Sequence, residues 1–247
     1  YSEKTKRKFI MSSSVGLSIS AASIGGGRGI FGKDALGHEV GMQESVSRLI
    51  PILEEEYPSV EFFWKKKITK SEIVAKVNPK VTYNPEVENS FVSPDGGVVF
   101  VKYEGEEYPI LISEAKKQGT LLFKEDGTLR DNLTEKQVEL ALSGKDQTRG
   151  NAIERAYKNI DEFKLYCESL NYFPYVLFAC GKDFESGSSI LDRLDAMTRY
   201  EPRNVNYVAD LPQKVTAYVQ DEYFTANEMF DKIYDVAQTS LKCIGIK

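Results

Sequence analysis

Two runs of β-branched and aromatic residues, Val98–Tyr103 and Tyr108–Ser113, constrain the fold of this chain more than any other feature. Runs of this composition favour β-strands. The polar segment Glu104–Glu107 between them contains a glycine, which predicts a four-residue hairpin loop. Because charged residues stand at the outer ends of both runs, the hairpin would gather them at one end of a sheet.

The hairpin predicts which charged side chains meet. If the tyrosines that flank the loop face each other, Asp95 lies opposite Lys116. In the same register, Gly97 lies opposite Glu114. Opposed residues share a face, as do residues two apart on one strand. We therefore expect Asp95, Glu114 and Lys116 to converge on one side of the sheet, although a bend at residues 94–96 would shift this register by one.

The composition is that of an ordinary water-soluble protein. The chain has 247 residues and a net charge of −5, and we expect a single domain over residues 1–247 with a flexible, basic, Ser- and Gly-rich arm over residues 1–28. No apolar run approaches the ~20 residues of a membrane span, and no secretory signal is recognisable, which predicts a cytoplasmic protein. The negative charge argues against general nucleic-acid binding, but it permits a site-specific enzyme with a local basic cleft.

Histidine and cysteine are too scarce for several catalytic mechanisms. His38 is the only histidine, and we expect it to be structural or on the surface. The three cysteines lack metal-ligand spacing, which predicts buried, reduced thiols. Any hydrolysis must therefore depend on carboxylates, lysine and a metal ion.

Helical and extended patterns are mixed along the chain, which predicts an α/β fold. Apolar residues at helical spacing predict a long helix that begins at Asn151, and an uninterrupted apolar run predicts a buried strand over residues 174–181. Further helices are expected over residues 41–55, 70–77, 188–199 and 225–241. Residues 117–149 are mostly polar and predict an excursion over the surface or along a ligand.

Asp95, Glu114 and Lys116 are a suitable set for cutting a phosphodiester. Two carboxylates can hold Mg²⁺, and a lysine beside them can stabilise developing negative charge. The alternative is a surface hairpin in which Asp95 serves the turn and the other two are solvated neighbours. Because Glu114 ends the apolar strand Ile110–Ile112, where an isolated carboxylate is costly, the metal site is favoured.

A second segment, Arg149–Arg155, carries groups that read DNA bases. Asparagine can bridge adenine, and arginine can bridge guanine. Gly150 allows close approach of the backbone, and Asn151 begins a helix whose N-terminus favours phosphates. The alternative is that Asn151 is an N-cap with Glu154 as its capping-box partner, which leaves the two flanking arginines unexplained unless they form salt bridges.

Five separate blocks of the sequence, in the same order, resemble the EcoRI restriction endonuclease family. They are Ser93–Gly97, Ser113–Gly119, Gly150–Arg155, Phe173–Phe178 and Ile190–Asp195. The similarity extends over roughly residues 25–200. It implies the restriction-endonuclease-like fold of the Pro-Asp…Glu-x-Lys type, with a mixed central sheet flanked by helices, and a type II endonuclease of a restriction–modification system.

The resemblance also implies a Mg²⁺-dependent homodimer that cuts double-stranded DNA at a short palindrome and leaves 5′ phosphates and 5′ overhangs. Carried over by position, Asp95, Glu114 and the Ala115 carbonyl are metal ligands, and Lys116 is the catalytic lysine. The residues expected to contact DNA are Arg149, Gly150, Asn151, Ala152, Glu154, Arg155 and Arg193.

The chain departs from the EcoRI pattern where that pattern contacts the outer base pair. Gln147–Arg149 replaces Met-Ala-Ala, and Ala196 replaces a second arginine. An arginine directly before Gly-Asn-Ala also occurs in MunI, which cuts CAATTG. We therefore expect an AATT core and favour CAATTG over GAATTC. Two alternatives stay open: a repair or junction nuclease with the same core, and a DNA-binding protein without cleavage.

Overall fold

A computed structural model describes residues 30–81, 90–117, 151–181, 184, 189–209 and 213–247, with a few isolated positions between 128 and 142. The chain divides into two units, residues 1–33 and 34–247. Residues 1–29 lie outside the described residues, so the flexible arm and the single domain stay predictions. No described helix is long and apolar enough to cross a membrane.

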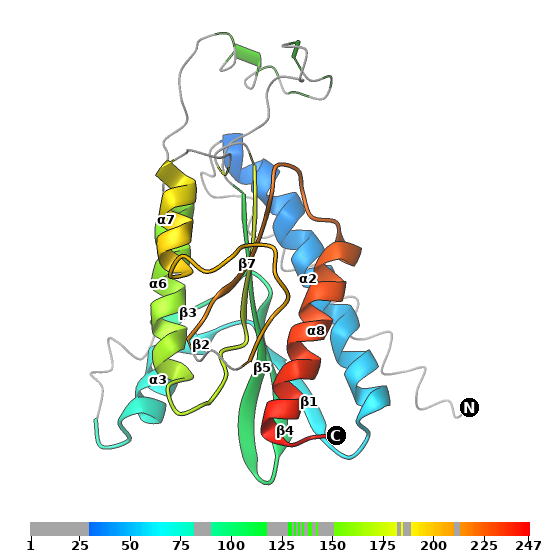
Figure 1. Ribbon diagram of the computed structural model, residues 1–247, viewed down its shortest axis with the longest axis vertical. Helices are drawn as coiled ribbons and strands as arrows, with labels where there is room; N and C mark the ends of the chain where they lie inside the picture. Colours follow the sequence, from blue (N-terminus) through cyan, green and yellow to red (C-terminus); the bar gives the residue numbers. More distant parts are fainter. Residues whose placement is uncertain are drawn as a thin grey trace. The chain divides into compact units, whose positions relative to one another are not determined.

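A mixed sheet forms the centre of the larger unit (Figure 1). It has five strands, in the order β1-β4-β5-β6-β7. Its strands are β1 (Glu61–Lys65), β4 (Gly97–Tyr103), β5 (Glu106–Lys117), β6 (Tyr175–Cys180) and β7 (Thr216–Gln220). β4 is antiparallel to both of its neighbours, whereas β6 and β7 run parallel to β5. Two short strands, β2 (Ile68–Thr69) and β3 (Phe91–Val92), pair separately.

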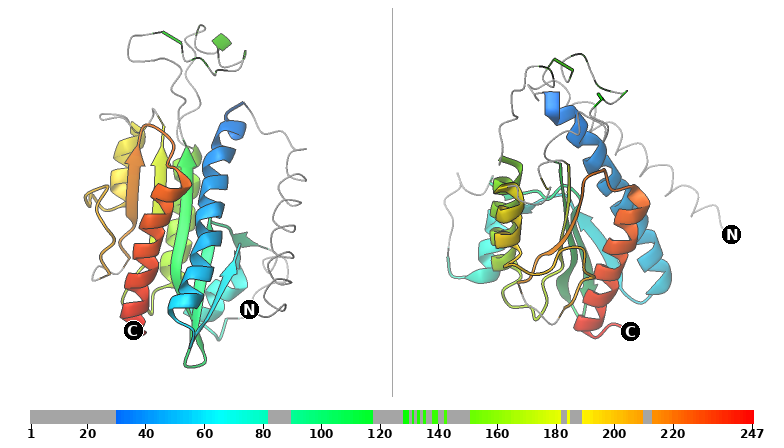
Figure 2. Two further views of the ribbon diagram at one scale, coloured as in Figure 1. Left: turned by 90° about the vertical axis from the view of Figure 1, so that its right-hand side faces the viewer. Right: turned by 45° about the horizontal axis from the view of Figure 1, so that its top comes forward.

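Helices cover both faces of the sheet (Figure 2). One face packs against α3 (Lys70–Val77), α6 (Asn151–Tyr166) and α7 (Ser189–Met197). The other face packs against α2 (Ile30–Glu56) and α8 (Ala226–Ile244). Burial on both sides explains why β6 is apolar at every position. The predicted α/β fold with a mixed, helix-flanked sheet is confirmed.

The hairpin loop is shorter than predicted. It consists of Glu104 and Gly105 alone, and both residues have positive φ angles, of 52° and 86°. Two consecutive positive φ angles are typical of a type I′ turn, whose twist matches that of the strands. Tyr103 therefore pairs with Glu106 and not with Tyr108, so the predicted register is wrong.

A β-bulge between the loop and the charged end of the hairpin shifts the strand register by one residue. Phe100 pairs with Pro109 whereas Val99 pairs with Leu111, which leaves Ile110 as the extra residue. Beyond the bulge Gly97 lies opposite Ser113 and not opposite Glu114. The expected pairing was wrong here as well, because the sequence pattern gives no sign of the extra residue.

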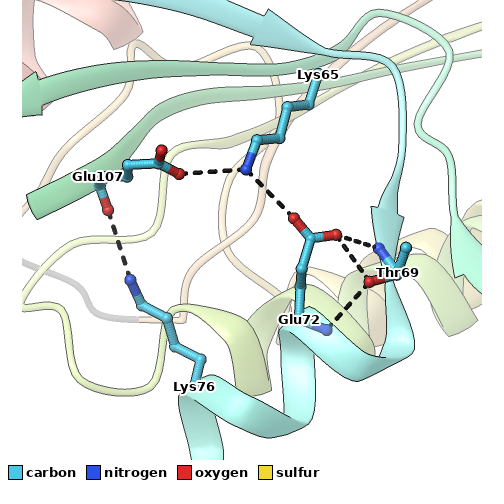
Figure 3. A network of polar contacts seen from close by, with 5 residues as sticks. All are labelled: Lys65, Thr69, Glu72, Lys76 and Glu107. Carbon is cyan, nitrogen blue, oxygen red and sulfur yellow. Dashed lines mark hydrogen bonds and ion pairs between the residues drawn. The ribbon is translucent and has the colours of Figure 1, made fainter. Parts of the chain in front are cut away.

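A network of polar contacts ties α3 to the hairpin (Figure 3). Lys65 on β1 lies 3.2 Å from carboxylate oxygens of both Glu72 on α3 and Glu107 on β5. Glu72 also forms a capping box with Thr69, whose hydroxyl accepts a hydrogen bond from the Glu72 N–H at 3.1 Å. Since α3 packs against α6, the network holds this helical layer to the first residues of β5.

Candidate active site

A tight turn holds Asp95 at the start of β4. The N–H of Gly97 donates to the carbonyl of Pro94 at 2.9 Å, so Asp95 and Gly96 occupy the central positions. A Cβ at Gly96 would lie 2.1 Å from the Ser113 hydroxyl oxygen. Gly97 has a φ of +73° and packs against the indole of Trp64. Both glycines are therefore required by the close approach of the turn to its neighbours.

The structure brings Asp95, Glu114 and Lys116 together. The Lys116 ammonium nitrogen lies 2.6 Å from Asp95 Oδ2 and 2.5 Å from Glu114 Oε1. Two backbone groups complete the arrangement: Ala115 N–H donates to Asp95 Oδ2 at 3.1 Å, and Asp95 N–H donates to Glu114 Oε2 at 3.3 Å. Asp95 thus joins the group from the turn and not, as predicted, from a paired strand position.

Burial and charge determine the protonation of this cluster. Glu114 is 1% exposed. Burial raises the pKa of Glu114 to about 7, a rise that Lys116 opposes and Asp95 reinforces. Burial lowers the pKa of Lys116, but the two carboxylates outweigh it and raise that pKa above its ordinary value. Lys116 therefore carries a positive charge at neutral pH.

Two further residues that the sequence pattern did not indicate lie near the cluster. The side-chain amide of Asn159 on α6 donates to Glu114 Oε1 at 3.3 Å. Tyr175 on β6 is fully buried, which raises the pKa of its hydroxyl, and the charges of Glu114 and Asp95 raise it further. The sequence pattern gives no signal for either residue, because Asn159 lies outside the apolar stripe of α6 and Tyr175 belongs to a strand that is buried at every position.

The donor set fits a hard divalent cation. Among the described residues, no group of three or more His, Cys, Asp and Glu side chains could hold a metal ion. The carboxylates of Asp95 and Glu114 nevertheless both converge on one cation, the Lys116 ammonium. Two carboxylates suit Mg²⁺, which prefers hard oxygen ligands and keeps several of its waters in protein sites.

The predicted DNA-reading residues are only partly described. Arg149 and Gly150 lie outside the described residues, and Asn151 and Ala152 are the first two residues of α6. Glu154 and Arg155 follow them and are exposed. The structure brings Arg193 on α7 to Glu154, with 3.1 Å between Arg193 Nη1 and Glu154 Oε1.

His38 lies on the opposite face of the sheet from Glu114. It is buried on α2, where it stacks on Phe224 with ring centroids 5.9 Å apart. Its Nδ1 lies 3.5 Å from the Cys180 sulfur. Burial lowers the pKa of His38 to about 4, with smaller contributions from Lys117 and Lys116. The ring is therefore neutral at pH 7 and belongs to the core.

A mixed sheet that presents an aspartate, a glutamate and a lysine at the ends of two adjacent strands defines a class, the nucleases of the Pro-Asp…Glu-x-Lys type. Within that class, residues 24–207 match the sequence model of the family described as restriction endonuclease EcoRI. The chain belongs to the EcoRI restriction endonuclease family.

Two curated relatives extend the similarity over most of the chain. The type II restriction enzyme EcoRI of Escherichia coli is 34% identical to this chain, and the match covers 88% of this chain and 89% of that protein. The type II restriction enzyme RsrI of Cereibacter sphaeroides is 29% identical to this chain, and the match covers 90% of each protein. The predicted class, type II restriction endonucleases, is confirmed at the level of the family.

Proposed function

We propose that this protein cuts double-stranded DNA at a palindrome with an AATT core, with CAATTG favoured over GAATTC, and leaves 5′ phosphates and 5′ overhangs. The observation that carries the proposal is the convergence of Asp95, Glu114 and Lys116 at one point beside α6. These residue types can hold a metal ion and stabilise charge on a phosphate.

Asp95, Glu114 and the Ala115 carbonyl are the proposed ligands of Mg²⁺. A bound Mg²⁺ supplies Lewis acidity at the scissile phosphate and lowers the pKa of a coordinated water. The raised pKa of Glu114 supports this assignment, because a buried carboxylate next to a second carboxylate gains by binding a divalent cation.

Lys116 is the proposed catalytic lysine, and its charge determines its role. Because the two carboxylates raise its pKa, Lys116 donates hydrogen bonds in the resting protein and is a poor proton acceptor. Its ammonium group would orient the attacking water and stabilise the negative charge that develops on the phosphate. Asp95 and Glu114 hold this group in place.

The proposed DNA-reading residues are Arg149, Gly150, Asn151, Ala152, Glu154, Arg155 and Arg193. An asparagine amide can bridge adenine and an arginine can bridge guanine, so this segment supplies the groups that AATT and an outer G·C pair require. The exposed ion pair between Glu154 and Arg193 supports a shared surface formed by α6 and α7. A palindromic site further implies a homodimer, because two-fold protein symmetry then matches two-fold DNA symmetry. Membership of the restriction endonuclease family supports a cytoplasmic location.

Digestion of plasmids that carry CAATTG, GAATTC or other AATT-containing hexamers tests the proposal directly. We expect discrete fragments from CAATTG plasmids in Mg²⁺ and none in EDTA, with fragment ends that share one sequence and one 5′ overhang. Cleavage at GAATTC alone would refute the assignment of the outer pair. Structure-dependent nicking would indicate a junction nuclease, and binding without cleavage would indicate a DNA-binding protein.

A further inference from the structure

Asn159 provides a direct hydrogen bond between α6 and the buried carboxylate of Glu114. Its amide nitrogen lies 3.3 Å from Glu114 Oε1, the same oxygen that Lys116 contacts. Only the N–H₂ end of an amide can face a carboxylate favourably, so the contact fixes the orientation of the Asn159 side chain. Asn159 is half-buried, whereas its neighbour Lys158 is exposed.

Glu114 depends on such donors because burial removes its access to water. A buried carboxylate needs hydrogen bonds or opposite charge to offset the lost hydration. Glu114 Oε2 accepts from the Asp95 backbone, and Oε1 is shared between Lys116 and Asn159. Of these donors, Asn159 is the one that belongs to a helix, so it alone relates the carboxylate to a separate layer of the fold.

The same helix begins with the segment proposed to read DNA. Asn151 is the first residue of α6, and Asn159 follows eight positions later, or about 12 Å along the helix axis. Between them, Ile153 and Ala156 are buried against the sheet. A short, packed helix moves as a unit, so a displacement of its first turn reaches Asn159.

We propose that Asn159 is a positioning residue that couples DNA recognition to the metal site. Its amide holds Glu114 Oε1 at a position set by α6, so that seating of the helix N-terminus on the cognate sequence places Glu114 for metal binding. In this proposal Asn159 acts through Glu114 and not by contact with the DNA. This inference rests on the proposed role of Glu114 as a metal ligand.

The test compares Asn159→Ala with Asp161→Asn, a control that changes an exposed residue on the same helix. DNA affinity is measured by fluorescence anisotropy without divalent cation, and cleavage is measured in single-turnover reactions in Mg²⁺. A hydrogen bond to a charged group corresponds to about a 10- to 100-fold change in an equilibrium or rate constant. We expect Asn159→Ala to bind cognate DNA within threefold of the wild type and to cleave roughly 10- to 100-fold more slowly.

Cation binding gives a second readout that does not depend on cleavage. Trp64 is the only tryptophan of the chain, and its indole donates to the Gly96 carbonyl at 2.8 Å, beside Asp95. Titration with Mn²⁺, followed by Trp64 fluorescence, should show weaker binding in Asn159→Ala and unchanged binding in Asp161→Asn. Asn159→Gln, which keeps a donor, should recover part of the affinity.

The outcomes separate this inference from the proposed function. If the wild type binds Mn²⁺ but does not cleave DNA, the proposed function fails while the titration still decides the role of Asn159. Equal Mn²⁺ affinity in Asn159→Ala and the wild type, or cleavage within threefold, overturns the inference. If Asn159→Ala does not fold, Asn159→Asp decides by the same titration: the proposal requires altered Mn²⁺ affinity, and unchanged affinity overturns it.

Discussion

The buried imidazole of His38 should make the stability of this protein fall in mild acid. In the folded protein the pKa of His38 is about 4, compared with 6.5 for an ordinary histidine. The unfolded chain therefore binds a proton that the folded protein rejects at pH values between 6.5 and 4. The stability due to neutral His38 is fully present above pH 6.5 and is progressively lost as the pH falls through this range.

The size of the effect follows from the two pKa values. As the pH falls from 7 to 5, protonation of His38 in the unfolded chain should lower the free energy of unfolding by about 2 kcal/mol. Glu114 works in the opposite direction, since its raised pKa makes the folded protein lose stability as the pH rises from 4.5 to 7. The quantity to compare is therefore the difference in unfolding free energy between the wild type and His38→Gln, because the contributions of all other titrating groups cancel in that difference.

Urea denaturation followed by Trp64 fluorescence at pH 7 and pH 5 provides the measurement. His38→Gln should lose stability at pH 7 through imperfect packing, and the gap to the wild type should narrow by about 2 kcal/mol at pH 5. If the two proteins lose the same unfolding free energy between pH 7 and pH 5, the assignment of a buried, neutral imidazole is refuted. Because His38 lies across the sheet from Glu114, the variant should also cleave DNA at pH 7.5 within threefold of the wild type. A loss of cleavage in a fully folded variant would instead favour a histidine-dependent mechanism.

Three further predictions follow from the site and the helix ends. Glu114→Gln should abolish cleavage and retain specific DNA binding, because a neutral amide relieves repulsion with phosphate. Gel-shift and cleavage assays on one oligonucleotide measure binding and cleavage. Loss of binding would contradict the assignment of Glu114 as a metal ligand. Arg149→Ala should weaken the free energy of DNA binding by ~1–3 kcal/mol and reduce discrimination at the outer base pair. Competition between CAATTG and GAATTC duplexes measures this discrimination. If it is unchanged, another residue reads that pair. Thr225→Ala should lower the free energy of unfolding by about 1 kcal/mol, because the Thr225 hydroxyl caps α8 by accepting a hydrogen bond from the Glu228 N–H at 3.2 Å. Thr225→Ser, which keeps the hydroxyl, is the control. Equal melting temperatures of the two variants would show that the cap does not contribute to stability.

The sequence predicted local elements well where composition was unambiguous. The helix over residues 70–77 matches α3, and the buried strand over residues 174–181 contains β6. The helix over residues 41–55 covers only part of α2, which begins at Ile30. β1 and β7 were not predicted, because each has five residues and neither is apolar throughout. Short strands of mixed polarity are fixed by their partners and not by their own sequence.

The candidate site was predictable in its membership and less so in its geometry. Asp95, Glu114 and Lys116 meet as expected, yet the expected register failed at two points. The positive φ of Glu104 shortened the loop, and the extra residue Ile110 shifted the pairing back by one. Asn159 was out of reach, since its contact with Glu114 joins residues 45 positions apart and leaves no periodic trace.

The bulge at Ile110 has a consequence for the two adjacent lysines at the end of β5. Lys116 lies among carboxylates on the α6 side, whereas Lys117 lies over the ring of Tyr223 on the α8 side. Because successive strand residues alternate sides, deleting one residue between Leu111 and Glu114 would exchange the sides of the two lysines and move Glu114 away from Asp95, whereas deleting the extra residue Ile110 would remove the bulge and keep this register. The number of residues between the bulge and Lys116 therefore determines which side of the sheet each lysine faces.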